Sequence, residues 1–252
     1  MVSRREFLRR VSALTVGATA ARVLYGCAAT PVVSGARLTA RPHRPSKTIT
    51  PGVVSLGLVK SRDTQLVVPK SYRPDKPATL ILGLHGATQD SEFIMYILRD
   101  AAERAGYLLL APNSRDVTWD VVHGYVGEDE RLLDAALDWT FDRCNVDPGR
   151  VVLAGFSDGA TVALSLGLIN GDLFNRVIAF SPGFIVGDER NGHPRVFISH
   201  GTRDQILPID RTSRRIVPAL QRQGYDVTFK EFDGPHRAPV DVVNSAIEWL
   251  SS

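Results

Sequence analysis

VVLAGFSDGATVAL, residues 151–164, places a Gly-x-Ser-x-Gly pentapeptide between two apolar runs. Residues 151–154 suit a buried strand, and residues 159–168 suit a helix. Gly155 and Gly159 flank Ser157 at the two positions where a tight strand-to-helix turn leaves no room for a side chain. Such a turn exposes the serine hydroxyl beside the N–H groups and the positive end of the helix. The pattern therefore predicts Ser157 as a nucleophile.

Strands and helices alternate on both sides of this turn. Two apolar runs, 53–60 and 64–69, predict an antiparallel hairpin at the start of the domain. The parallel strands that we expect after it cover residues 79–84, 107–111, 151–154, 176–180, 195–199 and 227–232. The expected helices cover residues 90–105, 128–141, 159–168, 209–222 and 239–250. This order predicts an α/β fold with a doubly wound, mostly parallel sheet, an N-terminal antiparallel hairpin and a single domain over residues 51–252.

A serine nucleophile needs a base and an acid that orients the base. His236 lies in a loop directly after the last predicted strand, where the active-site groups of open α/β sheets gather. Asp204 lies in the loop after the strand 195–199 and is the predicted acid. Asp210 is better explained as a helix cap, and Asp233 lies too close to His236 along the same loop.

These pieces resemble the α/β-hydrolase superfamily over roughly residues 53–250. The order of the His85-Gly86 loop, the elbow around Ser157, the Asp204 loop and the His236 loop is that of its serine esterases. Within the superfamily the chain is similar to the compact phospholipase/carboxylesterase and dienelactone-hydrolase-like groups. Residues 84–89 also resemble the corresponding loop of polyhydroxybutyrate-depolymerase-like esterases. The resemblance implies ester hydrolysis with no cofactor and no large cap domain.

The same resemblance assigns the oxyanion hole, the pair of N–H groups that holds the negative oxygen formed during the reaction. One N–H comes from the loop after the first parallel strand and the other from the residue after the nucleophile. In this sequence these are the backbone N–H groups of Ala87 and Asp158. We expect His85 to have a structural role.

The sequence also suggests where the substrate binds. Only 14 residues, 181–194, separate two predicted strands at the place where many lipases carry a helical cap. We therefore expect an open site for small or accessible esters. The longer loop 112–127 is expected to wall the pocket, with Trp119 as the substrate contact, although a core tryptophan under a surface loop is an equal alternative.

The N-terminal segment has the features of an export signal. Residues 3–9, SRREFLR, resemble the twin-arginine signal and precede a short apolar stretch that Arg22 interrupts. Residues 24–27 resemble a lipobox that would attach lipid to Cys27, although Tyr25 is bulkier than usual there. We expect an export signal over 1–27, a linker over 28–50, and a periplasmic or cell-envelope location with possible membrane attachment through the Cys27 lipid. The export machinery is then a partner.

The charge distribution argues against a nucleic-acid partner. The net charge of +3 comes from residues 1–26, which hold five arginines and one acid; the remaining 25 basic and 26 acidic residues give −1. No His or Cys spacing typical of a metal site is present. Cys144, the other cysteine, reads as a small buried residue.

Three alternatives to an esterase stay open at this point. A serine peptidase of this fold often adds a propeller or a cap, which this sequence lacks. An acyltransferase would differ only in excluding water from the acyl-enzyme. A non-catalytic envelope binding protein would be expected to lose a triad residue, and all three are present.

Overall fold

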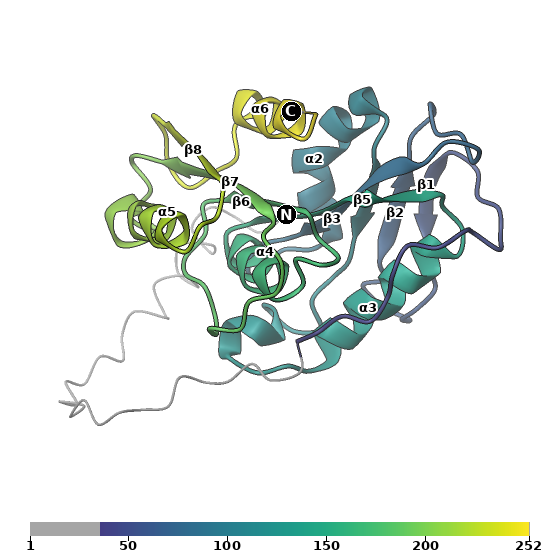
Figure 1. The fold of residues 1–252 in the computed structure, drawn as a ribbon, viewed down its shortest axis with the longest axis horizontal. Helices are drawn as coiled ribbons and strands as arrows, with labels where there is room; N and C mark the ends of the chain where they lie inside the picture. Colours follow the sequence, from purple (N-terminus) through teal and green to yellow (C-terminus); the bar gives the residue numbers. More distant parts are fainter. Residues whose placement is uncertain (1–35, 252) are drawn as a thin grey trace. The chain divides into compact units, whose positions relative to one another are not determined.

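An eight-stranded sheet organises the protein, whose computed structural model describes residues 36–251 (Figure 1). The strand order is β1-β2-β4-β3-β5-β6-β7-β8. Strand β2 is antiparallel to both of its neighbours, β1 and β4, and strands β3 to β8 run parallel to one another. The strands are β1 (Gly52–Ser55), β2 (Gln65–Val68), β3 (Ala78–Leu84), β4 (Leu108–Ala111), β5 (Val146–Phe156), β6 (Arg176–Phe180), β7 (Arg195–Gly201) and β8 (Val227–Phe232). The predicted fold class is confirmed.

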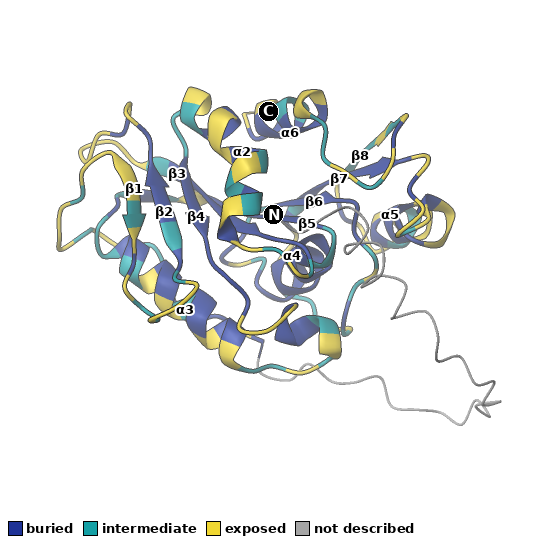
Figure 2. Cartoon of the chain, turned by 180° about the vertical axis from the view of Figure 1, so that it is seen from behind, coloured by how far each residue is buried: buried dark blue, intermediate teal, exposed yellow. Residues whose placement is uncertain are grey.

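Helices cover both faces of the sheet, so the central strands are buried on both sides (Figure 2). On one face lie α2 (Ser91–Ala105) and α6 (Val240–Trp249), and on the other lie α3 (Glu128–Phe141), α4 (Asp158–Ile169) and α5 (Ser213–Arg222). Leu80 and Leu82 of β3 pack on the second face, and Ile81 between them packs on the first. This burial explains why the parallel strands are almost continuously apolar.

Helix α4, which follows the Ser157 turn, is buried along its length from Gly159 to Ile169. A helix that is apolar all round belongs inside a core. The turn at its N-terminus is therefore attached to a helix that lies within the core. The expected strand 151–154 is the centre of β5, which is longer at both ends.

Two of the expected elements are shorter than predicted by several residues. The hairpin strand 53–60 ends at Ser55 because the Asp63 carboxylate accepts hydrogen bonds from the Ser55 hydroxyl and from the backbone N–H groups of Gly57 and Leu58. These bonds replace a strand ladder with a compact turn. The expected helix 209–222 is divided at Thr212, whose backbone leaves the helical region, into a 3-10 turn, η2 (Ile209–Arg211), and α5.

Residues 36–41 correct the prediction of a linker over 28–50. Ala36, Leu38 and Ala40 are buried and belong to the core that α3 and α4 cover. The alternation of buried and exposed residues is that of an extended chain lying along a surface. Part of the predicted linker is thus a strap on the catalytic domain.

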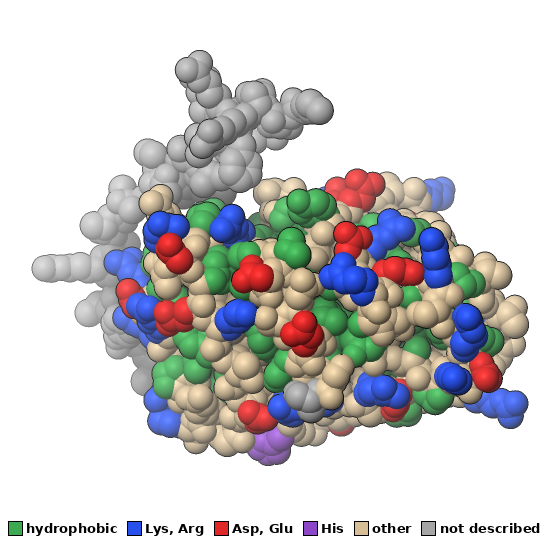
Figure 3. All heavy atoms as spheres, turned by 90° about the horizontal axis from the view of Figure 1, so that it is seen from above, with side chains coloured by type: hydrophobic (Ala, Val, Ile, Leu, Met, Phe, Trp, Pro, Cys, Tyr) green, Lys and Arg blue, Asp and Glu red, His purple; other side chains and the backbone are tan. Residues whose placement is uncertain are grey.

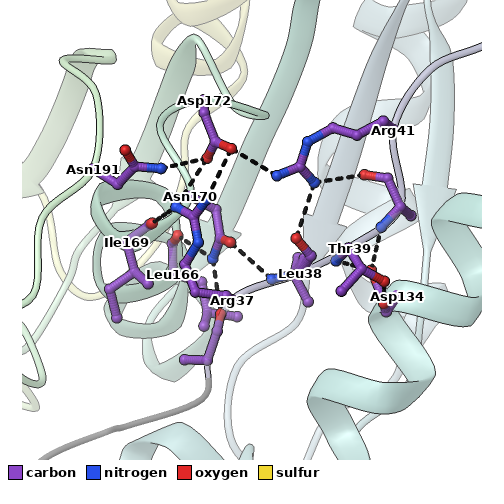
Figure 4. A network of polar contacts seen from close by, with 12 residues as sticks. Arg37, Leu38, Thr39, Arg41, Asp134, Leu166, Ile169, Asn170, Asp172 and Asn191 are labelled. Atoms are coloured by element: carbon purple, nitrogen blue, oxygen red, sulfur yellow. Dashed lines mark hydrogen bonds and ion pairs between the residues drawn. The ribbon is translucent and has the colours of Figure 1, made fainter.

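Polar side chains of the domain hold this strap, as Figure 4 shows. The Asn170 side chain accepts from Leu38 N at 2.8 Å and donates to Ala36 O at 2.9 Å. The Asp134 carboxylate accepts from Thr39 N and Ala40 N, both at 2.8 Å. These bonds satisfy the backbone of a segment that joins no sheet.

Three observations concern the surface charge, membrane-spanning helices and the predicted N-terminal signal. On the face seen in Figure 3, basic and acidic side chains are interspersed. Within residues 36–251, no helix has the length and apolarity needed to cross a membrane. The predicted signal, the lipobox and Cys27 lie outside the described residues.

Candidate active site

The predicted site residues all follow carboxyl ends of parallel strands. Ser157 follows β5, Asp204 follows β7, and His236 follows β8, while the Ala87 loop follows β3. The strand order β3-β5-β6-β7-β8 brings these four loops to one edge of the sheet. This edge is where open α/β sheets bind their ligands.

Ser157 occupies a strained turn. Its φ is 57° and its ψ is −118°, a conformation that is costly for a residue with a side chain. A Cβ atom on Gly155 would collide with the backbone of Gly159, and one on Gly159 would collide with the backbone of Leu84. The two glycines of the motif therefore permit the close packing that holds the serine in this conformation.

Asp204 and His236 meet at hydrogen-bond distance. His236 Nδ1 lies 2.6 Å from Asp204 Oδ2, and the side chains are 9% and 0% exposed. The imidazole ring also packs on the ring of Phe156, with centroids 4.9 Å apart, which brings it beside the residue that precedes Ser157. The predicted acid, the predicted base and the serine turn are thus assembled at one place.

The electrostatic environment keeps Asp204 ionised. Burial alone would raise the pKa of this carboxyl, but hydrogen bonds from His200, His236 and Leu207 N hold the pKa well below its usual range. An ionised Asp204 accepts the Nδ1 proton of His236, which leaves Nε2 of that ring free to act as a base. The other acids considered are exposed and paired elsewhere, Asp233 with Arg203 and Asp210 with Arg214.

His200 is a site residue that the sequence reasoning missed. It is fully buried, and its Nε2 lies 3.1 Å from Asp204 Oδ2. The signal in the sequence was its position at the end of β7, four residues before the predicted acid.

The loop after β3 packs directly on the serine turn. A Cβ atom on Gly86 would lie only 3.2 Å from Ser157 Cβ. The Gly86 carbonyl accepts from Gln89 N at 3.2 Å and lies 2.8 Å from His85 Nδ1. Because a trans peptide points its C=O and N–H in opposite directions, anchoring this carbonyl also fixes the direction of the Ala87 N–H. The Ala87 N–H, the predicted oxyanion donor, therefore has a fixed direction.

His85 has one defined tautomer. Ser114 N donates to His85 Nε2 at 3.0 Å, so the ring proton sits on Nδ1 and is donated to Gly86 O. Burial lowers the pKa of His85 and favours this neutral form. The predicted structural role has a concrete meaning here, because the ring braces the Gly86–Ala87 peptide.

Trp119 differs from the expected substrate contact. It is 0% exposed, its Nε1 donates to His85 O at 2.9 Å, and its ring packs on the His85 ring with centroids 4.8 Å apart. An indole that fills the space beneath the oxyanion loop cannot line an open pocket. The alternative of a core tryptophan therefore describes its position.

The segment 114–119 contacts both halves of the predicted oxyanion hole. Val117 O accepts from Thr88 N at 2.6 Å, on the Ala87 side. The Thr118 hydroxyl donates to Asp158 Oδ2 at 2.7 Å, on the nucleophile side. The Asp129 carboxylate in turn holds the loop through Arg115 N and Asp120 N. We call residues 114–119 the brace loop.

Metal ligands and reactive thiols are not part of this arrangement. In the part of the chain that the structure describes, no group of three or more His, Cys, Asp or Glu side chains could hold a metal ion. Cys144 is buried, and burial raises the pKa of its thiol to about 12. It therefore stays a protonated, apolar core residue at neutral pH.

Known proteins resemble this chain in sequence. Feruloyl esterase C of Emericella nidulans is 30% identical over 172 residues, which are 65% of this chain and 61% of that protein. A probable feruloyl esterase C of Aspergillus oryzae is 30% identical over 161 residues, 60% of this chain and 58% of that protein. The chain thus spans about three-fifths of these relatives.

Solved structures share the fold of this chain, and a family profile shows the family to which the chain belongs. Esterase PE8 superimposes with a TM-score of 0.61 at 24% identity, over 74% of this chain and 96% of that one. A ferulic acid esterase from Anaeromyces mucronatus, in complex with ferulic acid, gives 0.58 at 17% identity, over 83% and 95%. The profile described as Phospholipase/Carboxylesterase matches residues 124–252, just over half of the chain and the part that holds Ser157, Asp204 and His236. This chain belongs to the phospholipase/carboxylesterase family.

Proposed function

We propose that the chain is a serine carboxylesterase that forms an acyl-enzyme on Ser157. The observation that carries the proposal is the 2.6 Å contact between His236 Nδ1 and Asp204 Oδ2, in a pair whose ring packs on Phe156 beside the serine turn. This pair is what a serine hydroxyl needs to become a nucleophile at neutral pH. Family membership supports the same reaction class.

The reaction follows from these roles. His236 Nε2 takes the proton of the Ser157 hydroxyl while the oxygen attacks the ester carbonyl. The negative oxygen of the tetrahedral intermediate is held by the Ala87 and Asp158 N–H groups. His236 then gives its proton to the departing alcohol, and water, activated by the same ring, cleaves the acyl-enzyme to release the acid. Asp204 stabilises the imidazolium in both halves of the reaction.

The proposed substrates are accessible esters with an apolar or aromatic acyl group. Segment 181–194 carries no helix that could close over the site. The catalytic-edge loops expose Val117, Phe184 and Ile206, each 46–58% accessible. Apolar groups that stay exposed on a folded surface often mark a binding site. The relatives named as feruloyl esterases suggest hydroxycinnamoyl esters as the first aromatic substrates to test.

The deciding experiment measures hydrolysis of p-nitrophenyl acetate, p-nitrophenyl butyrate and methyl ferulate by the purified full chain. We expect activity that disappears in Ser157→Ala and persists in Ser61→Ala, a matched control at an exposed serine. A fluorophosphonate should label the wild type and the control but not Ser157→Ala. A folded protein with neither activity nor labelling would overturn the esterase proposal in favour of the binding-protein alternative. An acyltransferase would instead label normally and give ester products when an alcohol replaces water.

We also propose that the chain is exported by the twin-arginine route to the periplasm or cell envelope and is anchored through lipid on Cys27. The residues that support this are Arg4 and Arg5 before the apolar stretch and the lipobox-like sequence at 24–27. Replacing both arginines with lysine should keep the protein in the cytoplasm on fractionation. Cys27→Ala should release an exported protein from the membrane fraction, and an unchanged distribution would contradict the anchor.

A further inference from the structure

The acid of the site is shared by two histidines. Asp204 Oδ2 lies 2.6 Å from His236 Nδ1 and 3.1 Å from His200 Nε2. Asp204 Oδ1 accepts from the backbone N–H groups of Ile206 and Leu207 at 2.9 and 2.8 Å. Each carboxylate oxygen therefore has two partners, and His200 is one of the four.

The contacts of His200 fix the position of its proton. Nε2 lies 2.8 Å from Leu207 O, and a carbonyl oxygen can only accept a hydrogen bond. Nε2 must therefore carry a proton, which it shares between Leu207 O and Asp204 Oδ2. Nδ1 lies 2.7 Å from the Ser213 hydroxyl, which can rotate to donate to the neutral ring. Both ring nitrogens of a fully buried side chain are thus engaged.

Several charged groups face His200 from the elements around it. Asp204 lies in its own loop, with His236 on the other side of that carboxylate. Glu231 is its register partner on β8 and is bound by Arg214 of α5 at 2.6 Å. Since Arg214 already compensates Glu231, Asp204 is the carboxylate to which the Nε2 proton of His200 is directed.

We propose that His200 is a positioning residue for the acid, one that sets how strongly Asp204 attracts the proton of His236. This rests on the proposed esterase function. A hydrogen bond from His200 withdraws negative charge from the oxygen that faces His236. When that bond is lost, the same oxygen holds more charge, favours the imidazolium form of His236, and loses one of its positional restraints. The base then needs a higher pH to become neutral.

The test compares two substitutions at one position. In His200→Asn the amide nitrogen can reach the Nδ1 place but not the Nε2 place, so the bond to Asp204 is lost. In His200→Gln the longer side chain can carry an N–H to the Nε2 place. His193→Asn is the matched control, because His193 is exposed and its ring packs on that of Tyr225, away from Asp204 in sequence and outside the hydrogen bonds described above. The measurement is kcat and KM for p-nitrophenyl butyrate from pH 5 to 9, with thermal melting of each variant.

For His200→Asn we expect kcat to fall about tenfold with KM unchanged, as loss of a hydrogen bond to a charged group predicts. The acid limb of its pH profile should move to higher pH. His200→Gln should restore most of kcat and return the limb, and His193→Asn should match the wild type. A folded His200→Asn variant with wild-type kcat and an unmoved limb overturns the proposal and leaves His200 a packing residue.

A second measurement needs no variant. Nitrogen-15 spectra of histidine-labelled wild-type protein should show the His200 ring with a proton on Nε2, and a neutral ring with its proton on Nδ1 alone would overturn the proposal even if both substitutions prevent folding. Failure of the esterase proposal itself has a different signature. In that case the wild type is inactive and Ser157 is not labelled.

Discussion

At the scale of single residues, two side chains support the residues that are predicted to form the oxyanion hole. His85 fixes the Gly86–Ala87 peptide, and Thr118 holds the carboxylate of Asp158. His85 contacts the peptide that carries the Ala87 N–H, and Thr118 contacts the residue that carries the Asp158 N–H, and these two N–H groups are predicted to stabilise the oxyanion. Catalysis by such groups is sensitive to small misplacements, because the N–H donors must lie at hydrogen-bond distance from the charge as it forms.

Thr118 gives the sharpest prediction at this scale. Thr118→Val removes the hydroxyl that donates to Asp158 and keeps the shape of the side chain, whereas Thr118→Ser keeps the hydroxyl. We expect kcat for p-nitrophenyl butyrate to fall roughly tenfold in the valine variant, with little change in KM, and to stay near wild type in the serine variant. Equal kcat values in the two variants would show that Asp158 needs no support from Thr118.

At the scale of elements, the strap 36–41 is the least expected part of the fold. It forms no helix or strand, and its partners Asp134 and Asn170 come from α3 and the end of α4, 95 and 132 residues away along the chain. Asn170 is fully buried and bonds both a strap N–H and a strap carbonyl. Its side chain is therefore the central attachment of the strap.

Asn170→Ala should lower the free energy of unfolding by about 2–4 kcal/mol, because two buried backbone groups lose their partners. Urea denaturation of the full chain measures this change. Asn191→Ala is the control, since the Asn191 side chain makes its bond to Asp172 in a more exposed setting. The control should change the free energy of unfolding by less than about 1 kcal/mol. A similar loss in the free energy of unfolding in both variants would show that Asn170 is not the central attachment of the strap.

The difference between local signals and long-range contacts explains which parts of the fold could be predicted from the sequence. The parallel strands and the Ser157 turn have local signals, namely apolar runs and obligatory glycines, and helix 128–141 was predicted with the bounds that it has. The strap, the burial of Trp119 and the bond from His200 to Asp204 depend on contacts between distant segments. Their residues look the same in the sequence whether they face solvent, substrate or core. The catalytic roles of Ser157, Asp204 and His236, and the oxyanion roles of Ala87 and Asp158, stay predictions.

At the scale of the whole molecule, the site contributes to the dependence of stability on pH. The pKa of Asp204 is lower in the folded chain than in the unfolded one. The stabilisation that this group provides is complete above its unfolded pKa of about 3.9 and is lost as the pH falls toward the folded value. The folded protein therefore loses stability in acid partly through protonation of Asp204.

Asp204→Asn should lower the free energy of unfolding at pH 7 by about 2 kcal/mol, since a charged acceptor of several hydrogen bonds is lost. The difference from the wild type should narrow as the pH falls below about 4, where Asp204 begins to be protonated during unfolding. Thermal melting between pH 3 and pH 7 follows both quantities. Asp210→Asn, at a 75% exposed carboxylate, should track the wild type throughout, and a constant difference for Asp204→Asn would contradict the linkage.

The brace loop has a consequence for how catalysis begins. The brace loop is hydrogen-bonded both to Thr88, next to Ala87, and to the side chain of Asp158, so the two residues predicted to form the oxyanion hole are linked through one segment. We therefore predict that ester binding requires no rearrangement of these two residues, and that little reorganisation of their N–H groups accompanies the reaction. The rate of ester hydrolysis should accordingly rise with the electron-withdrawing power of the leaving alcohol, and the time course should show no lag before the first turnover.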